Sequence, residues 1–317
     1  MQNYKFKNYA RQAGMTLIEL SVVLLILVGL AGLLIPYVAG FGEKTHDSTT
    51  VSTIAELNNT VQRYQTTKMG LPSNLESLVV AAGTEYTFLP TTAKTIVAPL
   101  AVAAAAGPTD ASFANASLYK AGITKVLDMN DSTDDATFKA TLGAPVALSA
   151  NPFDGTSGQA LLRLTGDVTF TDQSFYGQLG NSLMVGAAPT ASEAVKNQLA
   201  YAFGGNPASW DTACTNYIVM GIGTDNGLIP EAMQSAPVHF GGSKGTAPAT
   251  TYSRFVGVFA VPSAAALGAT AATSNGSSSC MKPDAAAKFI GAAAVMDFPA
   301  IVGLNGSQQW ANSNLNK

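Results

Sequence analysis

The chain has 317 residues, of which 47% are apolar and 12% are charged, and its formal net charge is −3. So high an apolar content excludes an intrinsically disordered protein, and the length suits an anchor plus one large domain or two small ones. The low charge and the many small residues favour a loop-rich extracellular protein over a cytosolic enzyme. No basic stripe follows the first 42 residues, so nucleic-acid binding is not expected.

The first 14 residues form a short basic leader. Its charged residues are Lys5, Lys7 and Arg11, and it contains no acid. Such a charge keeps an N-terminus on the cytoplasmic side of a membrane by the positive-inside bias. Removal of the leader would leave 14 basic against 20 acidic residues, a net charge of −6.

The next segment is apolar and long enough to cross a bilayer. Residues 20–42 carry no charge. As a helix they would span about 35 Å, against a hydrocarbon core of about 30 Å. An ordinary cleaved signal peptide has a shorter apolar core that is followed by its cleavage site. A plain single-pass anchor is an alternative that explains the length.

Glu19 is an acid near the start of this apolar run, flanked by Ile18 and Leu20. An ionised side chain at membrane depth costs about 2.5–3.5 kcal/mol, so such residues are rare and usually functional. A plain anchor gives no reason for a carboxylate at this position. Glu19 is therefore a candidate functional residue.

The segment 11–20, in which Gly14 is followed by Met15 and then by Glu19, resembles the class III signal of type IV prepilins and pseudopilins. The resemblance implies that a prepilin peptidase cleaves between Gly14 and Met15 and methylates the new amino group of Met15. It also implies a single-pass protein of the inner membrane, which an assembly platform and a separate ATPase build into an extracellular filament. In its specific motifs the resemblance covers residues 11–42.

The resemblance assigns assembly roles to Glu19 and Pro36. A lone carboxylate is costly in an apolar environment and tolerable when paired. The Met15 amine of a neighbouring subunit would pair with Glu19 and fix the axial stagger between helices. Pro36 lacks a backbone donor and should kink or weaken the helix, which in pilins accompanies packing into the filament. Ordinary proline content of membrane helices is the alternative.

Apolar residues at three- and four-residue spacing continue beyond the anchor. Ile54 and Val61 belong to this series, which predicts an amphipathic helix over 43–69, stopped by Gly70 and Pro72. With the anchor, this gives one helix of about 50 residues, bent at the proline within the anchor.

The remaining residues, 70–317, predict one globular α+β head. Helices are expected after the capping boxes Ser73-x-x-Glu76 and Thr190-x-x-Glu193, with stops at Gly83 and Gly204, and over 134–142. Strands are expected at 160–164, 168–170, 183–186, 217–222, 252–261 and 289–298. The fold class expected is thus a pilin-like α+β fold, in which a long N-terminal helix packs on an antiparallel sheet.

The chain contains two cysteines, Cys214 and Cys280. An even pair in an exported domain indicates one disulfide, with two free buried thiols as the alternative. Many pilins stabilise the C-terminal part of the head with such a bond. The wide spacing of the pair, the Met15 start and the large head are similar to type IVb pilins.

No catalytic residue, cofactor or metal site is expected. His46 and His239 lack the spacing of a zinc site, and we expect His46 on an exposed helix face and His239 in a strand. The acidic run 128–135 starts like an EF-hand loop but lacks the turn glycine and the closing glutamate, which favours a solvated loop over a calcium site.

These features predict a structural subunit of a type IV pilus, a non-enzymatic homo-oligomer whose head serves adhesion, aggregation or motility. Its parts are the leader 1–14, the membrane and polymerisation helix 15–42, the amphipathic helix 43–69 and the head 70–317. A pseudopilin of type II secretion shares the anchor, and a minor adhesin pilin at the tip stays open. A membrane-tethered enzyme is disfavoured because histidine and charge are scarce.

Overall fold

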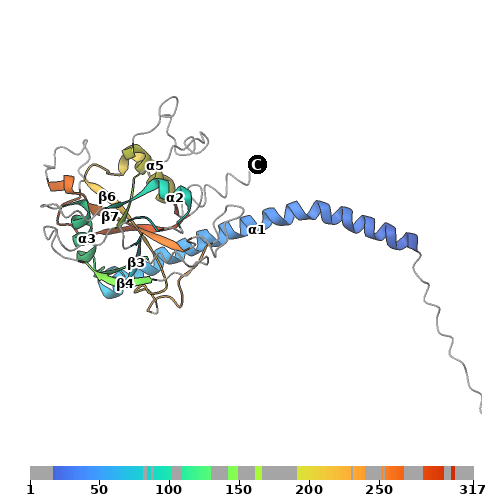
Figure 1. Cartoon of the computed structure of the whole chain (residues 1–317), viewed down its shortest axis with the longest axis horizontal. Coiled ribbons are helices and arrows are strands. Elements are labelled where there is room, and N and C mark those ends of the chain that lie inside the picture. Colours follow the sequence, from blue (N-terminus) through green and yellow to red (C-terminus); the bar gives the residue numbers. More distant parts are fainter. Residues whose placement is uncertain are drawn as a thin grey trace, which may run out of the picture. The chain divides into compact units, whose positions relative to one another are not determined.

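The fold was analysed in a computed structural model of the chain (Figure 1). The chain divides into two compact units, residues 1–45 and 46–317, and each is described by itself. The structure describes residues 17–80, 84–86, 89–100, 109–129, 142–148, 161–165, 191–229, 231–239, 252, 254–267, 281–295 and 301–303.

α1 (Leu17–Lys68) is one helix of 52 residues, which confirms the expected length of about 50. In the second unit its inward face carries Ile54, Leu57 and Val61, all almost completely buried. Their spacing of three and four residues is that of one helix face. The helix ends where Met69 adopts a left-handed conformation with φ of 57°.

The head is built on a sheet in which the order of the described strands is β4-β3-β1-β6-β7-β8-β9, with β2 paired to β5 and β5 also paired to β6. The strand bounds are β1 Leu75–Val80, β2 Val97–Leu100, β3 Lys125–Met129, β4 Leu142–Ala147, β5 Leu161–Leu164, β6 Thr215–Gly221, β7 Phe255–Pro262, β8 Lys288–Val295 and β9 Ile301–Gly303.

The sheet is antiparallel between described strands except for one pair. β1 and β3 run parallel, with Leu75 opposite Val126. A parallel pair needs a crossover connection, and part of that connection is the helix α3 (Asp110–Lys120). The expected α+β class with an antiparallel-rich sheet is therefore confirmed, with a parallel addition at β1–β3.

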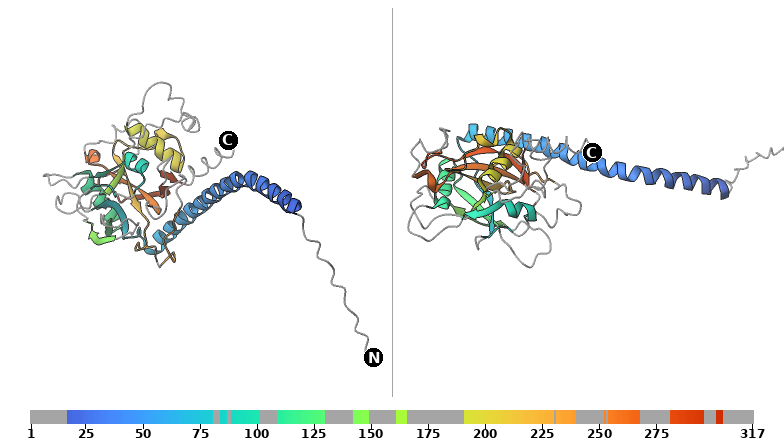
Figure 2. Two further views of the ribbon diagram at one scale, coloured as in Figure 1. Left: turned by 45° about the vertical axis from the view of Figure 1, so that its right-hand side comes forward. Right: turned by 90° about the horizontal axis from the view of Figure 1, so that it is seen from above.

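Both faces of the sheet are covered. On β6, Ile218 and Met220 belong to one apolar cluster, together with residues of α1 and α3. Tyr217 and Val219 belong to the second cluster, which also contains residues of α2 (Thr91–Ile96) and α5 (Ala191–Phe203). Successive strand residues point to opposite faces, so the two clusters lie on the two sides of the sheet. Figure 2 shows the ribbon of the sheet and its helices in two further views.

Burial on both faces explains why the central strands are continuous apolar runs rather than alternating ones. All eight residues of β7 are buried.

Two short 3₁₀ helices connect parts of the head. Pro207–Ser209 follows α5, and Ala264–Leu267 follows β7.

The helix expected after Ser73-x-x-Glu76 is wrong. Residues 75–80 form β1, and all six are buried. The Ser73 hydroxyl accepts a hydrogen bond from the Thr124 amide at 2.9 Å instead of capping a helix. Glu76, the supposed partner in the capping box, is buried in an ion pair. Long-range contacts thus override the local signal here.

The helix expected over 134–142 is wrong at its C-terminal end, since Leu142 and the Gly143 that was to close it lie in β4. The rest of that range lies outside the described residues. The helix over 191–203 is confirmed as α5, and Gly204 ends it with φ of 86°. Its expected cap, Thr190, lies outside the described residues.

Four expected strands are confirmed within a few residues, as β5, β6, β7 and β8. The strands expected at 168–170 and 183–186 lie outside the described residues, as does the acidic run from 130 onward. Sequence reasoning missed β1, β2, β3, β4 and β9 and the helices α2 and α3.

Candidate functional site

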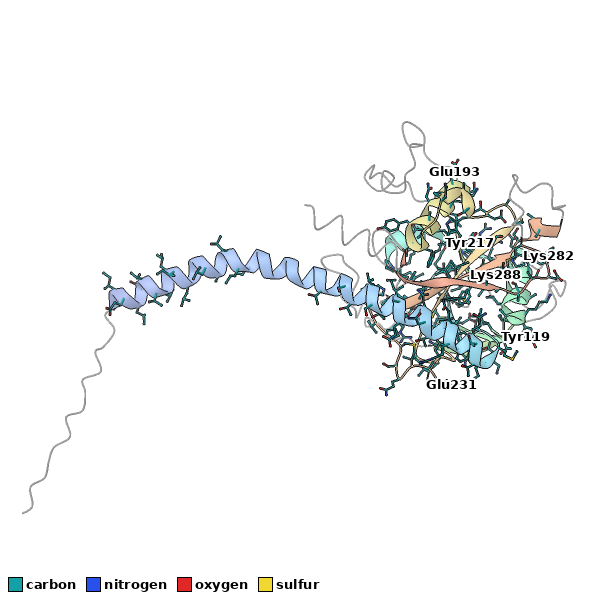
Figure 3. The ribbon with its side chains drawn as sticks, turned by 180° about the vertical axis from the view of Figure 1, so that it is seen from behind. Tyr119, Glu193, Tyr217, Glu231, Lys282 and Lys288 are labelled. Atoms are coloured by element: carbon teal, nitrogen blue, oxygen red, sulfur yellow. The ribbon has the colours of Figure 1, made fainter. Side chains whose placement is uncertain are left out.

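The N-terminal part of α1 is long and apolar enough to cross a membrane. Its residues Leu17–Ile35 have a mean hydropathy of 2.7 over 19 residues, and none of the segment is buried within the chain. The large side chains are exposed on every side of the helix, with exposed fractions of 86% at Leu17, 74% at Leu25 and 76% at Leu33. Figure 3 shows side chains projecting both above and below this part of the helix.

A helix that is apolar all round is stable only where lipid or other protein surrounds it. The apolar surface of Leu17–Ile35 therefore needs an apolar cover. A bilayer and a bundle of identical helices both provide such a cover.

Glu19 is the one charged residue in this segment. It lies in the first turn of the helix as described and is exposed. A carboxylate in the first turn is favoured by the partial positive charge of the helix N-terminus. The neighbouring hydroxyl, Ser21, donates to the Ile18 carbonyl at 2.9 Å and so needs no partner outside the helix. Glu19 is thus the one ionisable side chain that an apolar cover of this segment would enclose.

Two glycines lie on the same segment. A Cβ atom added at Gly29 or Gly32 would meet nothing within 4 Å. Small residues on a membrane helix allow a second helix to approach closely. The surface of α1 between these glycines is therefore open to a neighbouring helix.

The other predicted processing and assembly residues are only partly described. Gly14 and Met15 lie outside the described residues. The backbone of α1 is helical through Pro36. The expected bend at this proline stays a prediction.

Cys214 is buried, just before β6, and it is disulfide-bonded. Its expected partner, Cys280, lies outside the described residues, so the pairing stays a prediction. Cys214 is close to the sheet, because its carbonyl accepts from the Ser263 amide at 3.0 Å, just beyond the end of β7.

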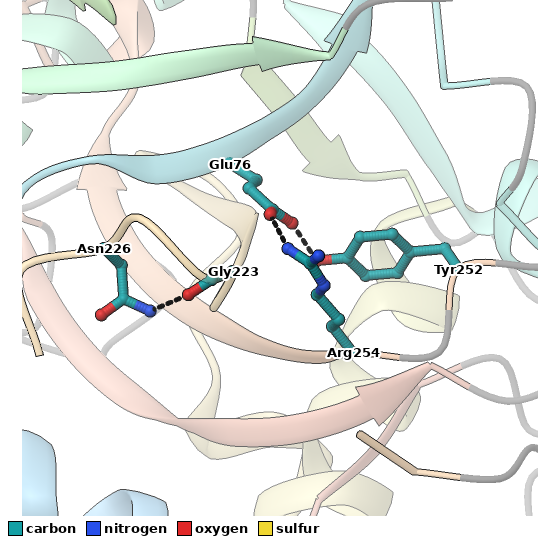
Figure 4. Close-up of polar contacts among 5 residues, drawn as sticks. All are labelled: Glu76, Gly223, Asn226, Tyr252 and Arg254. Atoms are coloured by element: carbon teal, nitrogen blue, oxygen red, sulfur yellow. Dashed lines mark hydrogen bonds and ion pairs between the residues drawn. The ribbon is translucent and has the colours of Figure 1, made fainter. Parts of the chain in front are cut away.

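A buried charged cluster lies in the sheet, and sequence reasoning missed it. Glu76 on β1 is completely buried and forms an ion pair with Arg254, whose side chain is 12% exposed. The Tyr252 hydroxyl donates to the second carboxylate oxygen of Glu76 at 2.6 Å. Figure 4 shows the guanidinium and the phenol converging on the carboxylate from the same side.

Two glycines make room for this cluster. A Cβ atom at Gly223 would overlap the Glu76 carboxylate, and one at Gly221 would overlap the Tyr252 hydroxyl. Asn226 fixes the turn that follows, because its amide nitrogen donates to the Gly223 carbonyl at 2.6 Å (Figure 4). The cluster is therefore tightly enclosed by its own chain.

Burial raises the pKa of Glu76, and the Arg254 charge and the Tyr252 hydrogen bond oppose that rise. The pKa of Tyr252 is raised well above its ordinary value, first by burial and then by the nearby Glu76 charge. Tyr252 thus stays protonated and donates at neutral pH. The three side chains join β1 to the start of β7 across β6, which is a structural role.

The sequence carried a weak signal for this cluster. Glu76 interrupts an apolar run, and Arg254 follows Tyr252 by two residues at the start of another. In a chain with so few charges, an acid and a base that each adjoin apolar runs are candidates for a buried pair. The Ser73-x-x-Glu76 pattern offered a simpler local interpretation, and that interpretation was wrong.

His239 is almost completely buried and lies edge-on to Phe255, with ring centroids 5.2 Å apart. Burial lowers the pKa of His239 to about 4, against the opposing effect of the Arg254 backbone. It follows an isolated bridge at Val238 rather than lying in a strand, so the expected strand position is wrong. The side chain of His46 lies outside the described residues.

Within the part of the chain that the structure describes, no group of three or more histidine, cysteine, aspartate or glutamate side chains is placed to hold a metal ion. No protein-family model, curated protein or solved structure matches this chain. In its specific motifs, the resemblance to prepilins therefore rests on residues 11–42.

Proposed function

We propose that this protein is a type IV pilin, a structural subunit without catalytic activity that polymerises through the first part of α1. The observation that carries the proposal is Glu19, the single charged side chain in the exposed apolar segment Leu17–Ile35 of α1. The leader before Glu19 supplies the opposite charge, since cleavage between Gly14 and Met15 would create an amino group four residues from Glu19.

Charge pairing gives the assembly its specificity. The Met15 amine of one subunit and the Glu19 carboxylate of the next neutralise each other when the two helices are staggered. At a separation of 4 Å and an effective dielectric constant near 20, their attraction is about 4 kcal/mol. A wrong stagger leaves both charges in apolar surroundings, which costs several kcal/mol per charge. One register between helices is therefore preferred.

The same chain then has two locations in succession. Before assembly, α1 anchors it as a single-pass protein of the inner membrane, where a prepilin peptidase removes residues 1–14. An assembly platform and a separate ATPase then transfer the subunit into an extracellular homo-oligomeric filament. The apolar helix exchanges lipid for neighbouring helices, and the head faces outward for adhesion, aggregation or motility.

The test is Glu19→Ala in cells that assemble the filament, with Glu56→Ala as the matched control. Glu56 is an exposed acid on the same helix but within the head unit. Glu19→Ala should leave membrane insertion and removal of the leader intact and lower the protein in sheared filaments at least about tenfold, which corresponds to a loss of about 1.4 kcal/mol per contact.

Glu56→Ala should assemble as the unmodified protein does. Immunoblots of the membrane and sheared-filament fractions measure both effects. Normal incorporation of Glu19→Ala into filaments would contradict the pairing role of Glu19. Equal losses in the two variants would show that the effect is not specific to Glu19.

A further inference from the structure

Two acids bracket the uncharged part of α1. Glu19 precedes residues 20–42, which carry no charge, and Glu43 follows them directly. The backbone is helical throughout this stretch, because α1 runs without interruption from Leu17 to Lys68 (Figure 1). Both acids lie in the first compact unit of the chain. The helical rise therefore sets how far apart the two acids are.

The uncharged stretch is slightly longer than the hydrocarbon core of a bilayer is thick. At a rise of about 1.5 Å per residue, residues 20–42 span about 35 Å, against a core of about 30 Å. These residues alone can therefore fill the core, with about 5 Å to spare. Neither Glu19 nor Glu43 has to enter the hydrocarbon for the helix to cross the bilayer.

Two positions of α1 in a bilayer compete. The described apolar span, Leu17–Ile35, fills the core when the hydrocarbon begins at Leu17, and Glu19 then lies inside it. A shift that places residues 20–39 in the core leaves Glu19 outside. This shift gives up the burial of two aliphatic side chains, those of Leu17 and Ile18.

The carboxylate of Glu19 decides between the two positions. The penalty for an ionised side chain in the hydrocarbon is about threefold larger than the gain from burying two aliphatic side chains. The position that leaves Glu19 outside is therefore favoured. In this position Glu19 lies next to the first residue of the core, at the level of the lipid headgroups, where water reaches it.

We propose that the bilayer holds Glu19 in the headgroup layer, so that assembly is the step that first encloses this carboxylate. The inference rests on the proposed function, because it concerns the same carboxylate before the subunit is assembled. In water the attraction between Glu19 and the Met15 amine of a neighbour is about fourfold weaker than at the effective dielectric constant of about 20 used above for the filament. Subunits in the membrane are thus kept from pairing early.

The experiment measures which residues of α1 are reached by water. The full-length chain carries one added cysteine, Ile18→Cys or Val38→Cys, which a water-soluble maleimide labels in opened membrane vesicles. Only the thiolate reacts, and hydrocarbon excludes charged groups. Ile18→Cys should therefore react at least about tenfold faster than Val38→Cys.

The matched control is Val28→Cys in the middle of the apolar span. It should react as slowly as Val38→Cys, and the unmodified protein gives the background from the native cysteines. If Val38→Cys reacted as fast as Ile18→Cys or faster, Glu19 would lie in the hydrocarbon and the proposal would be overturned. This measurement on vesicles needs no assembly of the variants.

The same label on sheared filaments tests the proposed function separately. There Ile18→Cys should react at least about tenfold more slowly than in vesicles, because neighbouring helices exclude water. Should Ile18→Cys assemble poorly, the nearly isosteric Ser21→Cys gives the same comparison, since the Ser21 hydroxyl bonds within its own helix. Equal rates in filaments and vesicles would contradict the pairing of Glu19 in the filament, whereas the reversed order in vesicles would contradict only its membrane position.

Discussion

At the scale of single residues, the head depends on charges that it has buried. Glu76 in β1 and Arg254 directly before β7 form an ion pair within a sheet whose central strands are buried on both faces. A buried ion pair adds little net stability, whereas removal of one partner leaves a charge unpaired in the interior and costs about 3–5 kcal/mol. This asymmetry makes the pair a good test of the described packing.

We therefore expect Arg254→Ala to lower the free energy of unfolding by about 3–5 kcal/mol. The matched control is Arg63→Ala, since Arg63 donates from an exposed position on α1 to the Ala232 carbonyl; it should cost about 1 kcal/mol or less. Denaturant titration of the full-length protein in detergent measures both. A cost below 1 kcal/mol for Arg254→Ala would contradict the buried pair.

His239 gives the head an acid sensitivity whose sign follows from burial. Its pKa is about 4 in the folded chain, against about 6.5 in an unfolded one. Between these two pH values, His239 is protonated in the unfolded chain and neutral in the folded chain. The free energy of unfolding therefore falls as the pH falls from about 6.5 to about 4. The loss attributable to His239 is about 3 kcal/mol.

The variant His239→Phe should remove that part of the pH dependence while keeping an aromatic ring against Phe255. His46→Gln, the change at the chain's other histidine, is the control. Unfolding free energies at pH 4.5 and pH 7 measure the effect. The same pH dependence in His239→Phe and in the unmodified protein would show that His239 is not the group responsible.

At the scale of secondary-structure elements, an element was easier to predict when the residues that stabilise it lie within the same segment of the sequence. The extent of α1 was predictable because uncharged and amphipathic patterns lie within the segment itself. The helix α3 was missed although its signal was local: Thr109 and Ser112 cap each other reciprocally, with serine in the place usually taken by glutamate or glutamine.

The strand β1 could not be predicted from its own residues. It lies between β3 and β6, so both of its faces and both of its edges are occupied by distant parts of the chain. Leu78 within it has φ of 58°, which no strand pattern anticipates. The cluster around Glu76 was missed for the same reason, because its partners follow it by more than 170 residues.

The end of α1 provides an element-scale prediction. Met69 terminates the helix in a left-handed conformation and is almost fully exposed, a position where glycine is preferred. Met69→Gly should raise the free energy of unfolding by about 1 kcal/mol. Asn74→Gly is the control, since Asn74 also has positive φ but asparagine tolerates it.

Chemical denaturation of the two variants measures the difference between them. A lower stability for Met69→Gly, or an equal gain at both positions, would show that strain at Met69 is not relieved by glycine.

At the scale of the whole molecule, the chain consists of two units that differ in how much apolar surface they expose. The first unit exposes an apolar helix, and the second buries two apolar clusters around a sheet. The two units also differ in composition, because a segment of mean hydropathy 2.7 precedes a region rich in turns. The details of the head depended on contacts between distant residues, which composition does not encode.

The expected bond between Cys214 and Cys280 belongs to this scale, because it closes a loop across the C-terminal part of the head. In the chain-entropy model, closing such a loop contributes on the order of 4 kcal/mol. Reduction should therefore lower the thermal midpoint of the head. Peptide mapping without reductant should recover the two cysteines in one linked fragment, and two free thiols would refute the bond.

The most direct test of the pilin assignment is the mass of the N-terminal peptide of the protein taken from cells. The expected peptide begins at Met15, carries one additional methyl group on its amine and contains Glu19. A chain that begins at Met1, or one cut after residue 40, would contradict the assignment, because no subunit would then offer an amine beside the carboxylate of its neighbour.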